Sequence, residues 1–229
     1  MPPPAYRERV EACNEVLAKV LAWRVDSRER VVELLRESYE RRGIEPLRGW
    51  SAYNLYDKEM ALLYALGKYG LGLDWSEYPY LSSIFWKEEA YEKAYRGILA
   101  GTPPPEAIKE SVGELTQEAV FRVLRLAVSL VVLGFEPEEH LAKVFHASLK
   151  HMEQFKHNLF TFMRFYVALR TAEHIASGEI RSRSEKEAFK LALCLKMGAQ
   201  GMAPPDDLVK LIARSVFKVG ERRLLRIFS

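Results

Sequence analysis

Apolar side chains recur every three or four residues along almost the whole chain, which is the spacing of one face of an α-helix. The first such face carries Tyr6, Val10, Cys13, Leu17, Val20 and Leu21. No segment of the sequence alternates apolar and polar residues in the way that a half-buried strand does. The pattern predicts an all-α fold, an irregular bundle of nine or ten helices.

Polar residues ahead of the apolar runs indicate where helices begin. Asp26 with Glu29, and Ser184 with Glu187, have the spacing of a capping box, in which two side chains accept hydrogen bonds from unpaired backbone N–H groups. Gly43 follows the second apolar stripe and is expected to end that helix, because glycine readily adopts the left-handed conformation found there. The first two predicted helices therefore form a hairpin.

The second half of the chain contains the most apolar helix. Residues 116–133 carry apolar side chains on nearly every side, which is typical of a helix surrounded by others. Helical spacing then continues over residues 137–177, with an interruption expected near Asn158 because an unbroken helix of that length is unusual. Pro205 starts a later helix that is expected to end near Gly220.

The best candidate for a linker is Gly101 followed by three consecutive prolines at 103–105. Proline removes a backbone N–H group and cannot continue a helix, so this run indicates a break. We therefore predict an N-terminal helical subdomain at 1–101 and a C-terminal one at 102–229. A single continuous domain bent at the prolines is the alternative.

The composition is that of a folded protein. Of the 229 residues, 48% are hydrophobic, enough to form a core without disulfides or a structural metal. Cys13 and Cys194 are accordingly expected to be buried free thiols. The longest uncharged apolar run, residues 126–135, is about half of the roughly 20 residues that span a membrane. No secretory signal is recognisable, so a cytoplasmic location without membrane contact is expected.

Positive charge is concentrated at the C-terminal end. Residues 180–229 contain 11 Lys and Arg against 5 Asp and Glu, whereas the chain as a whole has a net charge of only +3. Helical spacing would align several of these cations into a ridge able to face phosphates or an acidic protein. An ordinary solvated helix face is the alternative. The residues of this predicted basic ridge are Lys210, Arg214, Lys218, Arg222, Arg223 and Arg226.

Aromatic residues are concentrated earlier, between Trp50 and Tyr95. This segment holds 12 of the 26 Phe, Trp and Tyr residues, interspersed with more acidic than basic side chains, so it would repel phosphates. Core packing with tyrosine hydrogen bonds, a protein interface and a small-molecule pocket are three interpretations. The candidate interface residues are Trp50, Tyr53, Tyr56, Trp75, Tyr78 and Trp86.

Histidines suggest a metal site only weakly. All five fall between residues 140 and 174. Glu153 and His157, four residues apart on one helix, have a spacing that allows both to bind one ion, and His174 from another helix is the obvious third ligand. Solvent exposure explains the same residues without a metal.

No familiar catalytic motif occurs in the sequence, and no cofactor is expected. The leading hypothesis is a non-enzymatic helical module that binds a protein partner or self-associates. A nucleic-acid-associated protein that uses the basic ridge is the second hypothesis. A metalloenzyme built on Glu153, His157 and His174 is the third.

Two segments, Tyr53-Asn54-Leu55-Tyr56-Asp57-Lys58-Glu59-Met60-Ala61 and Gly67-Lys68-Tyr69-Gly70-Leu71-Gly72-Leu73-Asp74, resemble an uncharacterised protein family of crenarchaea. The opening Tyr6-Arg7-Glu8-Arg9 is similar too, so the resemblance covers the N-terminal third. It implies a thermophilic archaeal source and brings no activity, cofactor or catalytic residue. Asn and Gln, three of each, are as scarce as heat adaptation favours.

Overall fold

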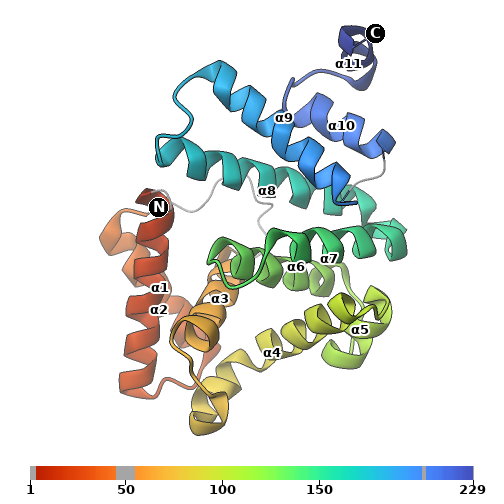
Figure 1. Ribbon diagram of the computed structural model, residues 1–229. Coiled ribbons are helices and arrows are strands. Elements are labelled where there is room, and N and C mark those ends of the chain that lie inside the picture. Colours follow the sequence, from red (N-terminus) through yellow and green to blue (C-terminus); the bar gives the residue numbers. More distant parts are fainter. Residues whose placement is uncertain (1–3, 45–54, 203–204, 229) are drawn as a thin grey trace. The chain divides into compact units, whose positions relative to one another are not determined.

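The computed structural model describes residues 4–44, 55–202 and 205–228, and within these ranges it contains eleven α-helices and no strand (Figure 1). The all-α prediction is confirmed. The helix count exceeds nine or ten because residues on both sides of predicted breaks form short helices of their own. Pro104–Val112 forms α5, and Glu221–Phe228 forms α11.

The helices group into two compact units, Ala5–Leu141 and Ala142–Ser229, called here the N-terminal unit and the C-terminal unit. The boundary predicted at residues 101–102 falls inside the N-terminal unit. There, α4 (Pro79–Ala100) and α5 pack against each other across the proline run. Pro104 occupies the first turn of α5, a position where a missing N–H group leaves no hydrogen bond unmade.

The core of the N-terminal unit is built around one helix. The unit comprises α1 (Pro4–Trp23), α2 (Arg28–Arg42), α3 (Leu55–Ala65), α4, α5 and α6 (Gln117–Val132), and α7 (Glu138–His151) begins in it. Residues 123–130 of α6 are all buried, and α6 packs against both α3 and α4. Helix α6 is thus surrounded by others, as its apolar pattern indicates, but it lies in the N-terminal unit and not in the predicted C-terminal subdomain.

Helix ends follow the expected chemistry, with a shift at one of them. Gly43 ends α2 at φ 61°, and Thr116 caps α6 by accepting a hydrogen bond from the Ala119 N–H group, as the sequence predicts. The cap of α2 is Ser27 rather than Asp26, because the Ser27 hydroxyl accepts from the Arg30 N–H group at 3.1 Å. The capping box expected at Asp26 and Glu29 is therefore wrong by one residue.

Beyond α3 the chain forms a π-helical turn, Leu66–Gly70, and then a 3₁₀ turn, Trp75–Glu77. Gly67 is needed in the first of these turns because a Cβ atom there would lie 2.7 Å from the Trp75 ring. Trp75 itself is buried and stacks on Tyr64, with ring centroids 5.6 Å apart. Gly67 therefore allows the close packing of this turn against Trp75.

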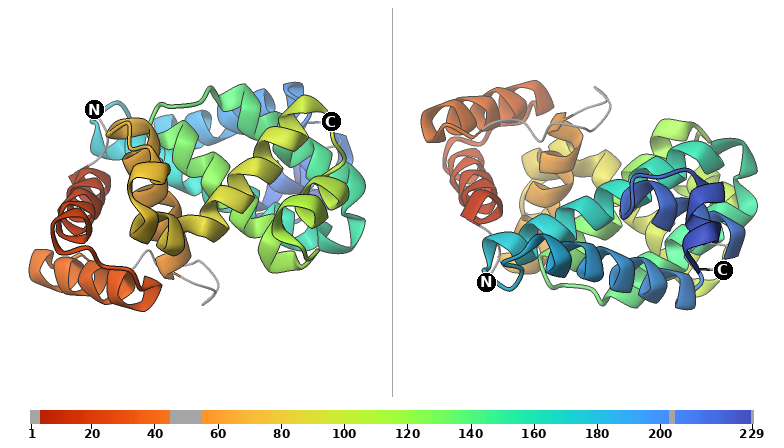
Figure 2. Two further views of the ribbon diagram at one scale, coloured as in Figure 1. Left: turned by 90° about the horizontal axis from the view of Figure 1, so that it is seen from below. Right: turned by 90° about the horizontal axis from the view of Figure 1, so that it is seen from above.

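In the C-terminal unit, the end of α7 leads into a 3₁₀ turn and four further helices. They are α8 (Lys156–Ala176), α9 (Arg183–Ala199), α10 (Pro205–Ser215) and α11. Helix α9 packs against both α8 and α10 (Figure 2). The interruption expected near Asn158 lies slightly earlier, at the 3₁₀ turn Glu153–Phe155. The helix expected to reach Gly220 ends at Ser215.

Both cysteines, Cys13 and Cys194, are buried free thiols, as predicted. Burial raises the pKa of the Cys194 thiol to about 11. Among the helices of the described ranges, none combines the length and apolar character that a bilayer crossing requires.

Candidate functional site

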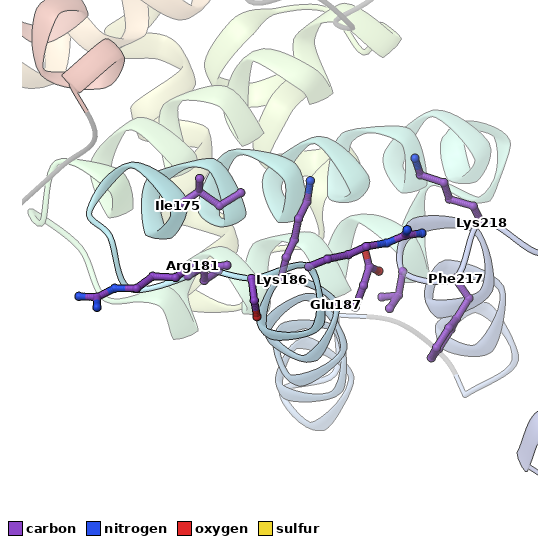
Figure 3. Close-up of a pocket in the computed structure, with 10 residues that line it drawn as sticks. Ile175, Arg181, Lys186, Glu187, Phe217 and Lys218 are labelled. Carbon is purple, nitrogen blue, oxygen red and sulfur yellow. The ribbon is translucent and has the colours of Figure 1, made fainter.

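A cavity of about 520 Å³ opens in the C-terminal unit, between the end of α8, the start of α9 and the residues that follow α10 (Figure 3). Its size is within the range of small-ligand sites, about 300 to 1,000 Å³. Four basic residues, one acidic residue and a set of apolar side chains surround it. The lining residues are Ile175, Ile180, Arg181, Ser182, Arg183, Lys186, Glu187, Val216, Phe217 and Lys218.

One wall of the cavity is fixed by the cap of α9. The Ser182 hydroxyl accepts a hydrogen bond from the Glu185 N–H group at 3.2 Å, and the Glu185 carboxylate accepts from the Ser182 N–H group at 2.9 Å. The capping box expected at Ser184 and Glu187 is therefore wrong by two residues. Glu187 has no role in the cap and instead lines the cavity.

The opposite wall is fixed by the residues after α10. The Val219 N–H group donates back to the Ala213 carbonyl at 2.9 Å, which folds the chain over the end of the helix. Lys218 lies in this turn at φ 50°, a left-handed conformation that only a few per cent of non-glycine residues adopt. The cavity thus includes a lysine whose backbone is held in an uncommon conformation.

The cavity has a strong excess of positive charge. Within the described part of the chain, the side chains of Arg181, Arg183, Lys186 and Lys218 form no ion pair with a carboxylate. Lys186 and Lys218 extend toward α8, whereas Arg181 extends away from them (Figure 3). The Nε atom of Arg181 donates to the Gly178 carbonyl at 2.9 Å. Such a concentration of unpaired cations favours an anionic ligand.

Glu187 is the one carboxylate among the lining residues. Its Oε2 atom is buried and accepts no hydrogen bond. A buried acceptor without a donor destabilises a protein by about 1 to 3 kcal/mol, so such atoms call for an explanation. The cavity therefore offers a hydrogen-bond acceptor as well as cations.

Charges in the N-terminal unit are arranged differently. Asp57 on α3 is buried and accepts hydrogen bonds from Arg28 and, at 2.9 Å, from Arg122. A third guanidinium, that of Arg125, lies 3.7 Å from the same carboxylate. Glu118 accepts from Arg122 and Arg125 at 3.1 Å each. Each carboxylate of this cluster is therefore shared by at least two arginines.

A second buried network surrounds Glu92 on α4. Its carboxylate accepts hydrogen bonds from Tyr64 at 2.5 Å, from Lys68 at 2.8 Å and from Tyr69. Burial alone would raise the pKa of Glu92, but these hydrogen bonds outweigh burial and lower it. Burial and Glu92 together raise the pKa of Tyr69 to about 12. Arg96 extends the network by donating to the Tyr69 hydroxyl at 2.8 Å.

A family model described as an uncharacterized protein conserved in archaea (DUF2192) matches residues 4–228. The chain belongs to this family. The match covers both units, so it reaches well beyond the N-terminal third in which the sequence resemblance lies. No curated protein and no solved structure matches the chain.

In this member of the archaeal family, all six residues of the predicted basic ridge are exposed. They do not form one continuous helix face, because α10 ends before Lys218. Lys210 lies 3.8 Å from Asp207, whereas Arg214 lies near another cation, Arg164 of α8. Burial and the charge of Arg214 lower the pKa of Arg164. Lys218 is the ridge residue that reaches the cavity. Sequence reasoning missed Arg181, Arg183 and Lys186, although their close spacing was visible.

The residues of the predicted aromatic interface differ in burial in this family member. Trp75 is buried, Tyr78 is half-buried, and Trp86 is 55% exposed. Trp50, Tyr53 and the side chain of Tyr56 lie outside the described residues. Tyrosine hydrogen bonding, one of the interpretations of this segment, accounts for Tyr64 and Tyr69.

The structure does not bring the candidate metal ligands together. His157 and His174 both lie on α8, 17 residues apart, which places them about 25 Å apart along the helix axis. His174 instead contacts Glu179, and Glu153 is exposed in the 3₁₀ turn before α8. Among the described residues, no group of three or more potential ligands could hold a metal ion.

Proposed function

We propose that this protein is a nucleic-acid-binding module whose C-terminal unit contacts phosphates through the cavity residues Arg181, Arg183, Lys186 and Lys218. The observation that carries the proposal is the absence of any ion pair for these four side chains in the described part of the chain. Cations that line one cavity without ion pairs repel one another in the free protein. Phosphate binding would remove that repulsion and release counterions from the nucleic acid.

The surroundings of the cations favour a nucleotide over an acidic protein segment. Ile175, Val216 and Phe217 line the same cavity. A base can lie against apolar and aromatic side chains while its phosphate meets the cations, and such stacking tolerates every base. An acidic peptide needs a positive surface but no apolar side chains beside the cations.

The remaining charge of this unit is consistent with a longer polyanion. Arg214 is exposed on α10, and Arg222, Arg223 and Arg226 are exposed on α11. With Lys210, these residues would extend phosphate contact beyond the cavity. We therefore keep the basic ridge as part of the proposed binding surface, with the cavity as its centre.

The proposal is tested by measuring the affinity of the full chain for a fluorescent single-stranded oligonucleotide at increasing salt. Four phosphate contacts give a slope of log affinity against log salt of about −2.8, so affinity should fall about 50-fold from about 50 to about 200 mM salt. Lys186→Gln should reduce the magnitude of the slope by about 0.7.

Lys93→Gln is the matched control, because Lys93 is an exposed lysine of the N-terminal unit with the same charge. It should leave both affinity and slope unchanged. Absence of binding at low salt would refute the proposal. Binding of an acidic peptide in place of nucleic acid, with the same dependence on Lys186, would assign the surface to a protein partner instead.

A further inference from the structure

Glu187 is the feature of the cavity that phosphate binding leaves unexplained. A site for phosphate alone gains nothing from a carboxylate, since its negative charge repels the ligand. Yet Glu187 lines the cavity, and its Oε2 atom is buried without a hydrogen-bond donor. The capping box formed by Ser182 and Glu185 leaves Glu187 with no structural task at the helix start.

The neighbouring cations do not neutralise this carboxylate. Within the described residues, no Lys, Arg or His side chain forms an ion pair with Glu187, although Arg183 and Lys186 line the same cavity. The cations and the Glu187 carboxylate are therefore not paired with each other, and each can contact a ligand. A complementary ligand carries an anionic group and, apart from it, a hydrogen-bond donor.

Nucleotides meet this requirement when the base has an exocyclic amino group. A carboxylate accepts a hydrogen bond from the amino group of cytosine, whereas uracil presents a carbonyl oxygen at the same position. Two acceptors facing each other repel, and the buried oxygen of Glu187 would remain without a donor. Strands of the two bases carry the same backbone charge, and on this edge the bases also differ at N3, which carries a hydrogen in uracil and none in cytosine.

We propose that the cavity binds one nucleotide of a single strand and selects a base with an exocyclic amino group through Glu187. This inference rests on the proposed nucleic-acid function and adds a specificity to it. Lys186 and Lys218 hold the phosphate on the side facing α8 (Figure 3). Phe217, an aromatic residue of the lining, provides the surface against which the base lies.

Single-stranded nucleic acid is required because a base that is stacked in a duplex cannot enter the cavity, even though one N–H of its amino group stays free in the major groove. An unpaired base can turn its edge into a cavity, as most sequence-specific RNA readers require. A duplex of the same length should therefore bind through its phosphates alone. Its affinity should be insensitive to substitution of Glu187.

The test compares oligocytidylate and oligouridylate of equal length by fluorescence anisotropy at one salt concentration and neutral pH. The wild-type protein should bind the cytidine strand about tenfold more tightly, the discrimination expected from one good contact between a side chain and a base edge. Glu187→Gln should bring this ratio close to one, because an amide can both donate and accept a hydrogen bond.

Three control measurements separate specificity from charge and folding. Glu110→Gln removes an exposed carboxylate of the N-terminal unit and should leave the ratio unchanged. Lys186→Gln should weaken binding of both strands equally and so preserve the ratio. The midpoint temperature of thermal unfolding of Glu187→Gln should equal or exceed that of the wild type, since the substitution removes a buried unsatisfied charge.

The outcomes distinguish this inference from the proposed function. If neither strand binds at low salt, the nucleic-acid function itself fails. If both strands bind with equal affinity and a steep salt dependence, the function stands and selection by Glu187 is refuted. A cytidine preference that persists in Glu187→Gln also overturns the inference, because another residue would then read the base.

Discussion

The charged cluster around Asp57 in the N-terminal unit and the one around the cavity in the C-terminal unit differ in how their cations are paired. In the N-terminal unit, buried Asp57 is shared by Arg28, Arg122 and Arg125. In the C-terminal unit, four cations line a cavity without an ion pair among the described residues, beside a carboxylate that has no hydrogen-bond donor. The same residue types thus serve internal cohesion in one unit and remain available to a ligand in the other.

This difference shows why a count of charges says little about function. Each unit contains several arginines, but the arginines around Asp57 are occupied and their loss should affect folding. Those around the cavity form no ion pair within the described chain, so their loss should affect binding. Substitutions in the two units can test that division directly.

The largest expected effect is that of Asp57→Asn. Removing this charge leaves Arg122 and Arg125 without their shared carboxylate, and breaking a buried ion pair destabilises proteins by about 3 to 5 kcal/mol. Urea unfolding monitored by circular dichroism measures the change. Lys186→Gln, at the cavity, should change stability by no more than about 0.5 kcal/mol. Equal losses in the two variants would remove the distinction between the units.

Gly67→Ala is expected to give a smaller loss of stability through overpacking. Its added Cβ atom would lie 2.7 Å from the rigid Trp75 ring, which should lower stability by about 1 to 3 kcal/mol. Gly198 in α9 is the matched site of the C-terminal unit, since the three atoms nearest to a Cβ there all belong to the Leu208 side chain. Because that side chain can change rotamer, Gly198→Ala should be the milder variant in the same urea assay.

Acid should weaken the N-terminal unit through Glu92. Its pKa is lower in the folded protein, so the unfolded chain binds more protons and the stabilisation is complete above about pH 4.5. Stability should then fall as pH decreases through the folded pKa, by about 2 kcal/mol for lost charged hydrogen bonds. The difference in unfolding free energy between wild type and Glu92→Gln, measured from pH 7 to pH 3, should shrink with acid. A constant difference would contradict this assignment.

The smallest effects concern two residues in the left-handed region, Arg24 and Lys218, both at φ 50°. Glycine adopts this conformation without strain, so Arg24→Gly and Lys218→Gly should each stabilise the protein by about 0.5 to 1 kcal/mol. Thermal unfolding measures both. The Lys218 variant alone should also lose affinity for oligonucleotide. A loss of affinity in both variants would mean that the effect is not local to the cavity.

Helix positions and several helix ends could be predicted from the sequence, because they depend on near neighbours. Gly43 and Thr116 act within one helical turn of the residues they cap. The cap of α9 was misplaced because Ser182 and Ser184 are both followed, three residues later, by a glutamate. Local pattern alone does not decide between two such overlapping pairs.

The charge clusters could not be predicted, because their partners are distant along the chain. Asp57 pairs with Arg28 across 29 residues and with Arg122 across 65. The cavity likewise joins Lys218 to residues of α8 and α9. Lys218 was a candidate from the sequence, but as part of a helical ridge. Its actual role depends on the end of α10 at Ser215, which the spacing of charges did not reveal.

The most direct test neutralises four cations in each unit and measures stability and oligonucleotide affinity together. The cavity variant carries Arg181→Gln, Arg183→Gln, Lys186→Gln and Lys218→Gln. The control variant carries Arg24→Gln, Arg36→Gln, Lys93→Gln and Lys109→Gln, which are exposed residues of the N-terminal unit. Both changes remove two arginines and two lysines, so the net charge is identical.

We expect the cavity variant to lose the part of the salt-dependent affinity that the cavity contributes, with a slope reduced in magnitude by about 2.8, and to unfold at the urea concentration of the wild type. The control variant should bind as the wild type does. Equal loss of affinity in both variants would show that only net charge matters. That result would contradict the claim that the cavity is where the C-terminal unit binds its ligand.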